Sequence, residues 1–106
     1  MAQFDVHRNP GQLRDSIPYV VVVQSAIFEG YQRRVVVPLV KKSHLGTVHN
    51  TRFNPAFTIK GENVVLHPLE IVSVPLARLG EPVASLATHA ERIATALDEL
   101  MTRAYG

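Results

Sequence analysis

Short runs of valine, separated by proline, glycine and polar residues, fill the first two-thirds of this chain and restrict what it can fold into. The clearest runs cover residues 19–23 and 35–37, and Pro38 follows the second. β-branched side chains favour extended backbone, and each run has the length of a single strand, so we predict a sheet with these strands inside it. The polar segment between them predicts a hairpin with a loose connection, and Pro38 is expected to end its second strand.

Further strands are expected on both sides of this hairpin. Phe4 and Val6 alternate with polar neighbours, which is typical of a short strand. A second hairpin is predicted around a turn at residues 61–63. The apolar period disappears over residues 41–54, which we interpret as a long loop with room for one helical turn. The remaining expected strands cover residues 57–60, 64–66 and 71–74.

After Gly80 the apolar residues recur every three or four positions, which predicts an amphipathic helix. Thr88 and Glu91 have the spacing of a capping box, so the helix should begin near residue 88. Glu99 and Arg103 are one turn apart and can form an ion pair. The expected apolar face consists of Leu86, Ala90, Ile93, Leu97, Leu100 and Ala104. The pattern as a whole predicts a mainly β domain over residues 1–106 with one C-terminal helix.

Composition excludes several classes of protein. The chain has 106 residues and no cysteine, so it can build one core without disulfides, and thiol catalysis is excluded. Residues 1–80 carry 9 basic and 5 acidic groups, and residues 81–106 carry 2 and 4, for a net charge of +2. This charge is too weak to indicate direct binding of duplex DNA. Neither a signal peptide nor a membrane span is found, so we expect a cytoplasmic protein without a membrane partner.

Patterns of catalytic or metal-binding residues are not found. The serines lack a nucleophile elbow, and the glycines do not form a phosphate-binding loop. His44 and His49 share the long loop, but the histidines as a group lack zinc-site spacing and are interpreted as surface residues. We therefore expect no metal, no cofactor and no enzymatic activity. The histidines are His7, His44, His49, His67 and His89.

Two adjacent arginines, Arg33 and Arg34, open the second valine strand. Because side chains alternate along a strand, the two should point to opposite faces. One could then lie over the sheet or in an interface while the other stays in solvent. Two roles would explain these arginines. They could prevent aggregation of the valine-rich strand, or they could bind a partner.

The order of several motifs resembles the CcdB family of toxins from bacterial toxin–antitoxin modules. The similar segments are QFDV at 3–6, VVQSAIF at 22–28, QRRVVVPL at 32–39, VSVPLARLGE at 72–81 and the helix that contains Ile93. The resemblance covers essentially the whole chain. It implies an SH3-like β-barrel with a C-terminal helix, as in CcdB and MazF proteins, and a homodimer.

The resemblance also implies a function. CcdB-like toxins bind the A subunit of DNA gyrase and trap the enzyme on cleaved DNA, so they are topoisomerase inhibitors rather than enzymes, and they serve in plasmid maintenance. A cognate CcdA-like antitoxin wraps the dimer and removes it from gyrase. Toxin and antitoxin together repress their own operon, so operator DNA is contacted only through the antitoxin complex.

Only some of the site residues of the family have a counterpart in this chain. Ile27 and Phe28 match the apolar pair that contacts gyrase, but this chain has no tryptophan for the family's terminal Trp-Gly-Ile. Alignment on Ile93 places Thr102 at the start of that tripeptide, and a shift of three residues places Tyr105 and Gly106 there. Three interpretations follow. The chain is a toxin that uses Tyr105, a homologue with weakened toxicity that keeps antitoxin binding, or a homologue that binds another target protein. The complete set of gyrase-binding candidates is Ile27, Phe28, Asp98, Met101, Thr102, Tyr105 and Gly106. The antitoxin-binding candidates are Arg8, Arg14, Arg33, Arg34, Lys41 and Lys42.

Two alternative functions are considered. The first is a MazF-like endoribonuclease toxin, in which Arg33, Arg34, His44 and Thr47 could position a phosphate. The second is a non-toxic CcdB homologue that only binds antitoxin.

Overall fold

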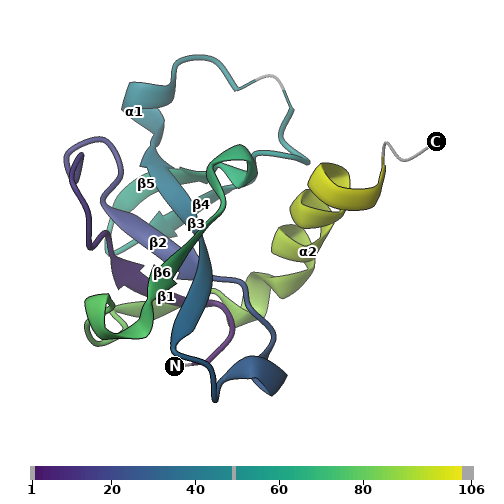
Figure 1. The fold of residues 1–106 in the computed structure, drawn as a ribbon. Helices are drawn as coiled ribbons and strands as arrows, with labels where there is room; N and C mark the ends of the chain where they lie inside the picture. The colour runs from purple at the N-terminus through teal and green to yellow at the C-terminus, as the bar shows by residue number, and fades with distance from the viewer. Residues whose placement is uncertain (1, 49, 104–106) are drawn as a thin grey trace.

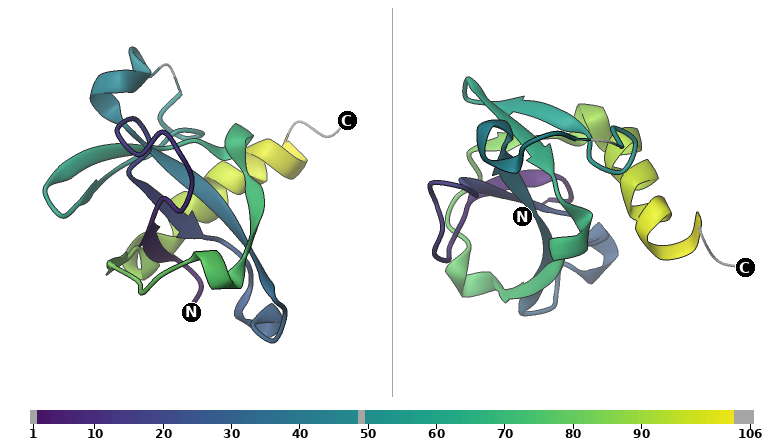
Figure 2. Two further views of the ribbon diagram at one scale, coloured as in Figure 1. Left: turned by 60° about the vertical axis from the view of Figure 1, so that its left-hand side comes forward. Right: turned by 90° about the horizontal axis from the view of Figure 1, so that it is seen from above.

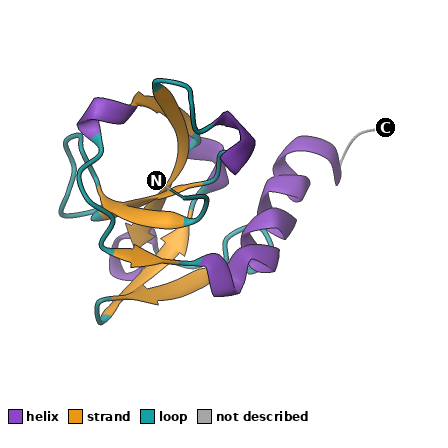
Figure 3. Ribbon diagram, turned by 90° about the horizontal axis from the view of Figure 1, so that it is seen from below, coloured by secondary structure: helices purple, strands orange, loops and turns teal. Residues whose placement is uncertain are grey.

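The computed structural model, which describes residues 2–48 and 50–103, shows a nearly closed antiparallel barrel with a helix along one side (Figure 1). Its sheet has the strand order β4-β5-β3-β2-β1-β7, and β6 pairs with β3 outside this path. The strands are β1 (Asp5–Arg8), β2 (Tyr19–Val22), β3 (Arg33–Lys41), β4 (Ala56–Ile59), β5 (Glu62–Leu66), β6 (Val72–Pro75) and β7 (Ala84–Ser85). The predicted barrel with a C-terminal helix is confirmed, and Figure 3 shows the helix standing outside the curved sheet.

The long strand β3 connects the two halves of the barrel. Its first part pairs with β6, from Arg33 to Val36, and its last part pairs with β5, from Leu39 to Lys41. Pro38 lies between these two stretches, where its missing N–H breaks no ladder bond, and its carbonyl accepts from the His67 N–H at 3.1 Å. The expectation that Pro38 ends the strand is therefore wrong, because a gap between two partners tolerates proline.

The second hairpin turns one residue earlier than predicted. Lys60 and Gly61 form the turn, with φ of 49° and 82°. Two successive residues with positive φ are typical of the tight hairpin turn that matches strand twist. Glu62 and Asn63, which were expected in the turn, belong to β5.

The C-terminal helix is built from three segments. The 3₁₀ turn η4 (Ala87–His89) leads into α2 (Ala90–Asp98), and the π turn η5 (Glu99–Arg103) continues it. The predicted capping box is wrong, because neither η4 nor α2 has a side-chain cap. Instead the Ser85 hydroxyl accepts from the Ala87 N–H at 3.2 Å. No helix within the described ranges is long and apolar enough to cross a membrane.

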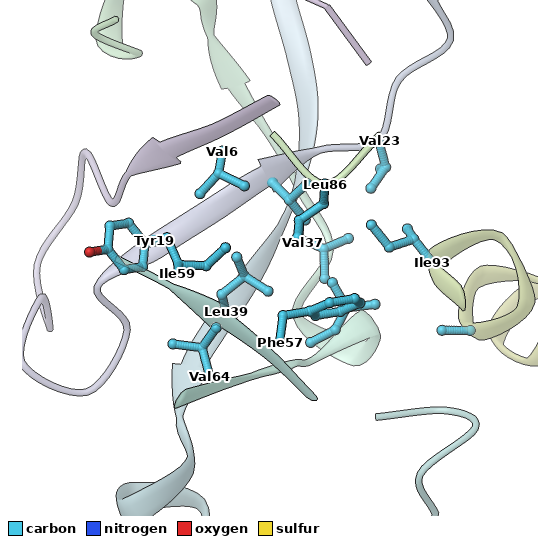
Figure 4. Packing of buried hydrophobic residues seen from close by; sticks show 13 residues of the cluster. Val6, Tyr19, Val23, Val37, Leu39, Phe57, Ile59, Val64, Leu86 and Ile93 are labelled. Carbon is cyan, nitrogen blue, oxygen red and sulfur yellow. The ribbon is translucent and has the colours of Figure 1, made fainter. Parts of the chain in front are cut away.

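The main core fills the barrel and continues to α2 (Figure 4). Ile93 is fully buried and points from the helix toward Val23 and Leu86, so the predicted apolar helix face is confirmed for this residue. A smaller cluster on the other face of the sheet contains Val20, Val22, Val36 and Leu79.

One histidine contradicts the expectation that all five lie on the surface. His7 in β1 is fully buried, and its Nδ1 donates to the Gly80 carbonyl at 2.9 Å. Its neighbour Val6 belongs to the main core, so both faces of β1 are covered. The alternation of polar and apolar residues in the sequence cannot reveal that His7 is buried. It does not show whether another part of the chain covers the polar face of the strand.

Candidate functional site

The connection between β2 and β3 exposes apolar side chains. Ser25 begins the 3₁₀ turn η1 (Ala26–Phe28), and its hydroxyl accepts from the Ile27 N–H at 3.4 Å. Ile27 is 81% exposed and Phe28 is 45% exposed. Tyr31 is also exposed, and its ring meets the Phe28 ring edge-on with centroids 5.9 Å apart. Exposed isoleucine and aromatic residues in one turn are typical of an interaction surface.

Gln24 fixes both ends of this connection. Its side-chain amide donates to the carbonyls of Phe28 and Arg33, at 3.1 and 3.2 Å. Its side-chain oxygen accepts from the Val35 N–H at 3.1 Å. One side chain thus replaces the backbone pairing that the strands lose where they separate.

Arg34 holds the same connection from the other side. Its Nη1 donates to the carbonyls of Tyr31 and Arg33 at 2.7 and 2.9 Å, and its Nη2 donates to the Glu29 carbonyl at 2.8 Å. Arg34 is 4% exposed, whereas Arg33 is exposed, so the predicted opposite orientation is confirmed. With its charge turned inward, Arg34 is not part of the basic surface that was expected to meet an antitoxin.

The helix end contributes further gyrase-binding candidates, which this chain does not bring together with η1. Asp98 is exposed and Met101 is 69% exposed. In Figures 1 and 2 (left), η1 lies at the lower end of the barrel and the helix ends near the upper right. The side chain of Thr102 and all of Tyr105 and Gly106 lie outside the described residues. The predicted Glu99–Arg103 pair is likewise untested, and Glu99 forms an ion pair with Arg52 at 2.9 Å.

The basic candidates fall into two groups at opposite ends of β3. Arg33 lies at the first end, where its guanidinium donates to the hydroxyl and carbonyl of Ser73 at 2.7 and 2.9 Å. Lys41 and Lys42 lie at the other end. Nine residues of strand separate the ends by roughly 26 Å, so a single small ligand cannot contact both groups. Arg14 lies in the loop between β1 and β2, and the Ser16 carbonyl of this loop accepts from the Lys41 N–H at 2.8 Å.

The second end of β3 contains a polar network around a buried phenol. The Tyr19 hydroxyl donates to a Glu62 carboxylate oxygen at 3.3 Å, and Lys41 lies 3.8 Å from the same carboxylate. The Arg8 guanidinium lies over the Tyr19 ring, 5.9 Å from its centroid. Burial, and after it the charge of Glu62, raises the pKa of Tyr19 above its ordinary value of 10.0.

The residues proposed for ribonuclease chemistry do not form a site. Arg34 is buried at the first end of β3, while His44 and Thr47 are exposed beyond its second end. His49 lies outside the described residues, so the suggested His44–His49 pair cannot be placed. Within the described ranges no three histidines, cysteines or carboxylates gather closely enough to hold a metal.

An exposed apolar strip was missed from the sequence. Leu69 in η2 (Pro68–Glu70) is 67% exposed, and Ile71 and Val72 are 37% and 48% exposed. The signal was available, because these residues follow Pro68 without the alternation that buries one face of a strand. A strip of this kind is a second candidate interface.

Comparison with known proteins adds one match. The model of a family described as CcdB protein matches residues 3–102 of this chain. The search of curated proteins gave no match. The matched range contains η1, both ends of β3, the exposed strip and the helix as far as Thr102.

Proposed function

We propose that this chain poisons DNA gyrase by binding its A subunit through η1. The chain belongs to the CcdB family and is therefore a toxin of a toxin–antitoxin system. The observation that carries this proposal is the exposure of Ile27 and Phe28 on a turn held by Gln24 and Arg34. In the family, the corresponding apolar pair contacts gyrase.

The bracing of η1 supports a docking role. A loop that is already ordered loses little conformational entropy when it binds, so its apolar contacts contribute more fully to affinity. Four backbone carbonyls between Phe28 and Arg33 are bonded by two side chains, which leaves the exposed apolar side chains free for a partner.

An aromatic pair at the end of η1, Phe28 with Tyr31 three residues later, could offset the missing tryptophan of the family. Phe28 and Tyr31 stack edge to face and present adjoining apolar area next to Ile27. Large aromatic surfaces carry much of the energy at protein interfaces. We therefore assign gyrase contact mainly to η1, with Asp98 and Met101 as secondary contacts.

The toxin is proposed to act as a homodimer and without catalysis of its own. The strip Leu69, Ile71 and Val72 offers the apolar surface that such a dimer would bury. Poisoning then requires only binding that stabilises gyrase while it is attached to cleaved DNA. The toxin would act in the cytoplasm, and a CcdA-like antitoxin would neutralise it and join it in repressing their operon.

A gyrase cleavage assay tests this proposal. Purified toxin, gyrase and supercoiled plasmid are incubated, and the protein is then denatured and digested. Linear DNA that depends on the toxin supports poisoning. If no gyrase A fragment binds at micromolar concentration and supercoiling proceeds normally, the proposal is wrong. Intact RNA after incubation with stoichiometric toxin separates this mechanism from ribonuclease activity.

A further inference from the structure

The outer edge of β4 has unused backbone groups. β4 ends the strand order and pairs only with β5 in the described part of the chain. The Pro55 carbonyl accepts from the Leu66 N–H at 3.0 Å, so alternation turns the backbone groups of Ala56 and Thr58 away from β5. The Ala56 carbonyl indeed accepts from outside the sheet, from Arg92 Nη2 at 2.8 Å. Thr58 therefore offers an N–H and a carbonyl to an added strand.

A groove made of three neighbouring hollows begins at this edge. Its middle hollow, of about 430 Å³, lies between β4 and the segment from Leu86 to Arg92. A second hollow of about 570 Å³ shares Lys42 with it, and a third of about 270 Å³ shares Arg92. Because each outer hollow shares a lining residue with the middle one, together they give room for an extended chain.

The middle hollow is positively charged. The charged side chains that line it are Lys42 and Arg92, and no carboxylate lines it. The carboxylate of the adjoining hollow on the Lys42 side, Glu62, is already engaged by Lys41 at 3.8 Å. An occupant with carboxylates at the centre of the groove would be complementary in charge.

The floor of the hollow favours a peptide over a nucleic acid. The Arg92 guanidinium lies 4.5 Å from the Phe57 ring centroid, and the His89 ring lies 5.6 Å from it. Phe57 is 6% exposed, so a base cannot stack on it. Arg92, by contrast, is exposed and held in place by its contacts with Ala56 and Phe57, ready to pair with a carboxylate.

We propose that this groove binds an extended acidic peptide, which adds as a strand beside Thr58 and places its carboxylates against Lys42 and Arg92. The site is distinct from η1, so an occupant could sit there while η1 holds gyrase. The antitoxin is the natural source of such a segment, and that attribution alone rests on the proposed function.

The probe is an eight-residue peptide in which glutamate alternates with valine, labelled with fluorescein and followed by anisotropy. We expect a dissociation constant on the order of 100 μM. Arg92→Gln and Lys42→Gln should each weaken binding about tenfold, because each removes a charged hydrogen-bond donor. Arg78→Gln, which removes an exposed arginine that lines none of the three hollows, should leave it unchanged. Exchange of the Thr58 amide proton should slow when the peptide binds.

Several results would overturn the inference. The first is absence of binding at millimolar peptide, and the second is equal binding of a peptide with glutamine in place of glutamate. The third is a loss of binding in Arg78→Gln as large as that in Arg92→Gln. Tighter binding of a single-stranded oligonucleotide that Arg92→Gln abolishes would assign the groove to nucleic acid instead. Gyrase cleavage is measured in parallel with the same variants. Failure of peptide binding with intact poisoning rejects only the groove, and the reverse rejects only the gyrase proposal.

Discussion

The two ends of β3 use basic residues in opposite ways. At the first end, Arg34 is buried and its guanidinium donates hydrogen bonds to backbone carbonyls. The neighbouring surface at η1 is therefore apolar. At the second end, Lys41 is partly exposed and Lys42 is exposed beside a groove. The buried charge of Arg34 is therefore structural, whereas the exposed charge of Lys42 is available to a partner. One small barrel can thereby present two chemically different surfaces roughly 26 Å apart.

The largest effect is expected where the charge is structural. Arg34→Met removes the donors to three carbonyls in a buried environment and should lower the free energy of unfolding by about 3 kcal/mol. Urea unfolding measures this change. Arg33→Met is the matched control, with an expected loss below about 1 kcal/mol, since Arg33 is exposed. Similar losses in both variants would show that Arg34 does not hold the connection.

Ile27→Ala should separate binding from stability. The side chain is 81% exposed, so the free energy of unfolding should change by less than about 0.5 kcal/mol. Affinity for a gyrase A fragment, measured by calorimetry, should fall about 30-fold, as for an interface hot spot of about 2 kcal/mol. Leu13→Ala alters a similarly exposed side chain on another loop and should bind normally. Equal affinities of the Ile27→Ala variant and the parent chain would remove η1 from the interface.

The polar network at the second end should make stability depend on alkaline pH. Because the pKa of Tyr19 is raised in the folded state, the unfolded phenol ionises first as pH rises above 10.0. The contribution of Tyr19 to the free energy of unfolding should therefore be constant below pH 10 and should decrease above it. Tyr19→Phe should remove part of the fall in urea midpoint between pH 9 and pH 11. Tyr31→Phe, which removes an exposed hydroxyl, should not, and an identical fall in both variants contradicts the assignment.

The smallest effect is expected for Lys41→Gln. Its 3.8 Å pair with Glu62 joins side chains that are 36% and 40% exposed, so solvent screens it, and the loss should be below about 0.5 kcal/mol. Chemical denaturation at low salt and at 0.5 M salt provides the measurement. A loss as large as that of Arg34→Met would mean that the two ends of β3 do not differ in the way described.

Much of the barrel was predictable because its signals are local. Valine runs and turn residues identified both hairpins, and the three- and four-residue spacing around Ile93 identified the helix and its buried face. Pro38 was misread because its tolerance depends on β5 and β6, two strands that come later in the chain. Long-range pairing of this kind leaves no mark in the local pattern.

The site was less predictable for a related reason. Alternation required Arg33 and Arg34 to face opposite sides, but it could not show which side the η1 connection would cover. The groove beside β4 depends on Arg92 reaching Ala56 across 36 positions of sequence, and no motif encodes that contact. By contrast, Ile27 and Phe28 were predicted as contact residues from the resemblance, and the structure shows only that both are exposed.

The most direct test of the difference between the two ends is a thiol footprint with a gyrase A fragment. The chain has no cysteine, so Ala26→Cys on η1 and Ser43→Cys on α1 (Lys42–Leu45) each provide a single reactive, exposed thiol. Saturating gyrase A should slow alkylation at position 26 at least about tenfold and leave position 43 unchanged. Protection at position 43 without protection at position 26 would contradict the account.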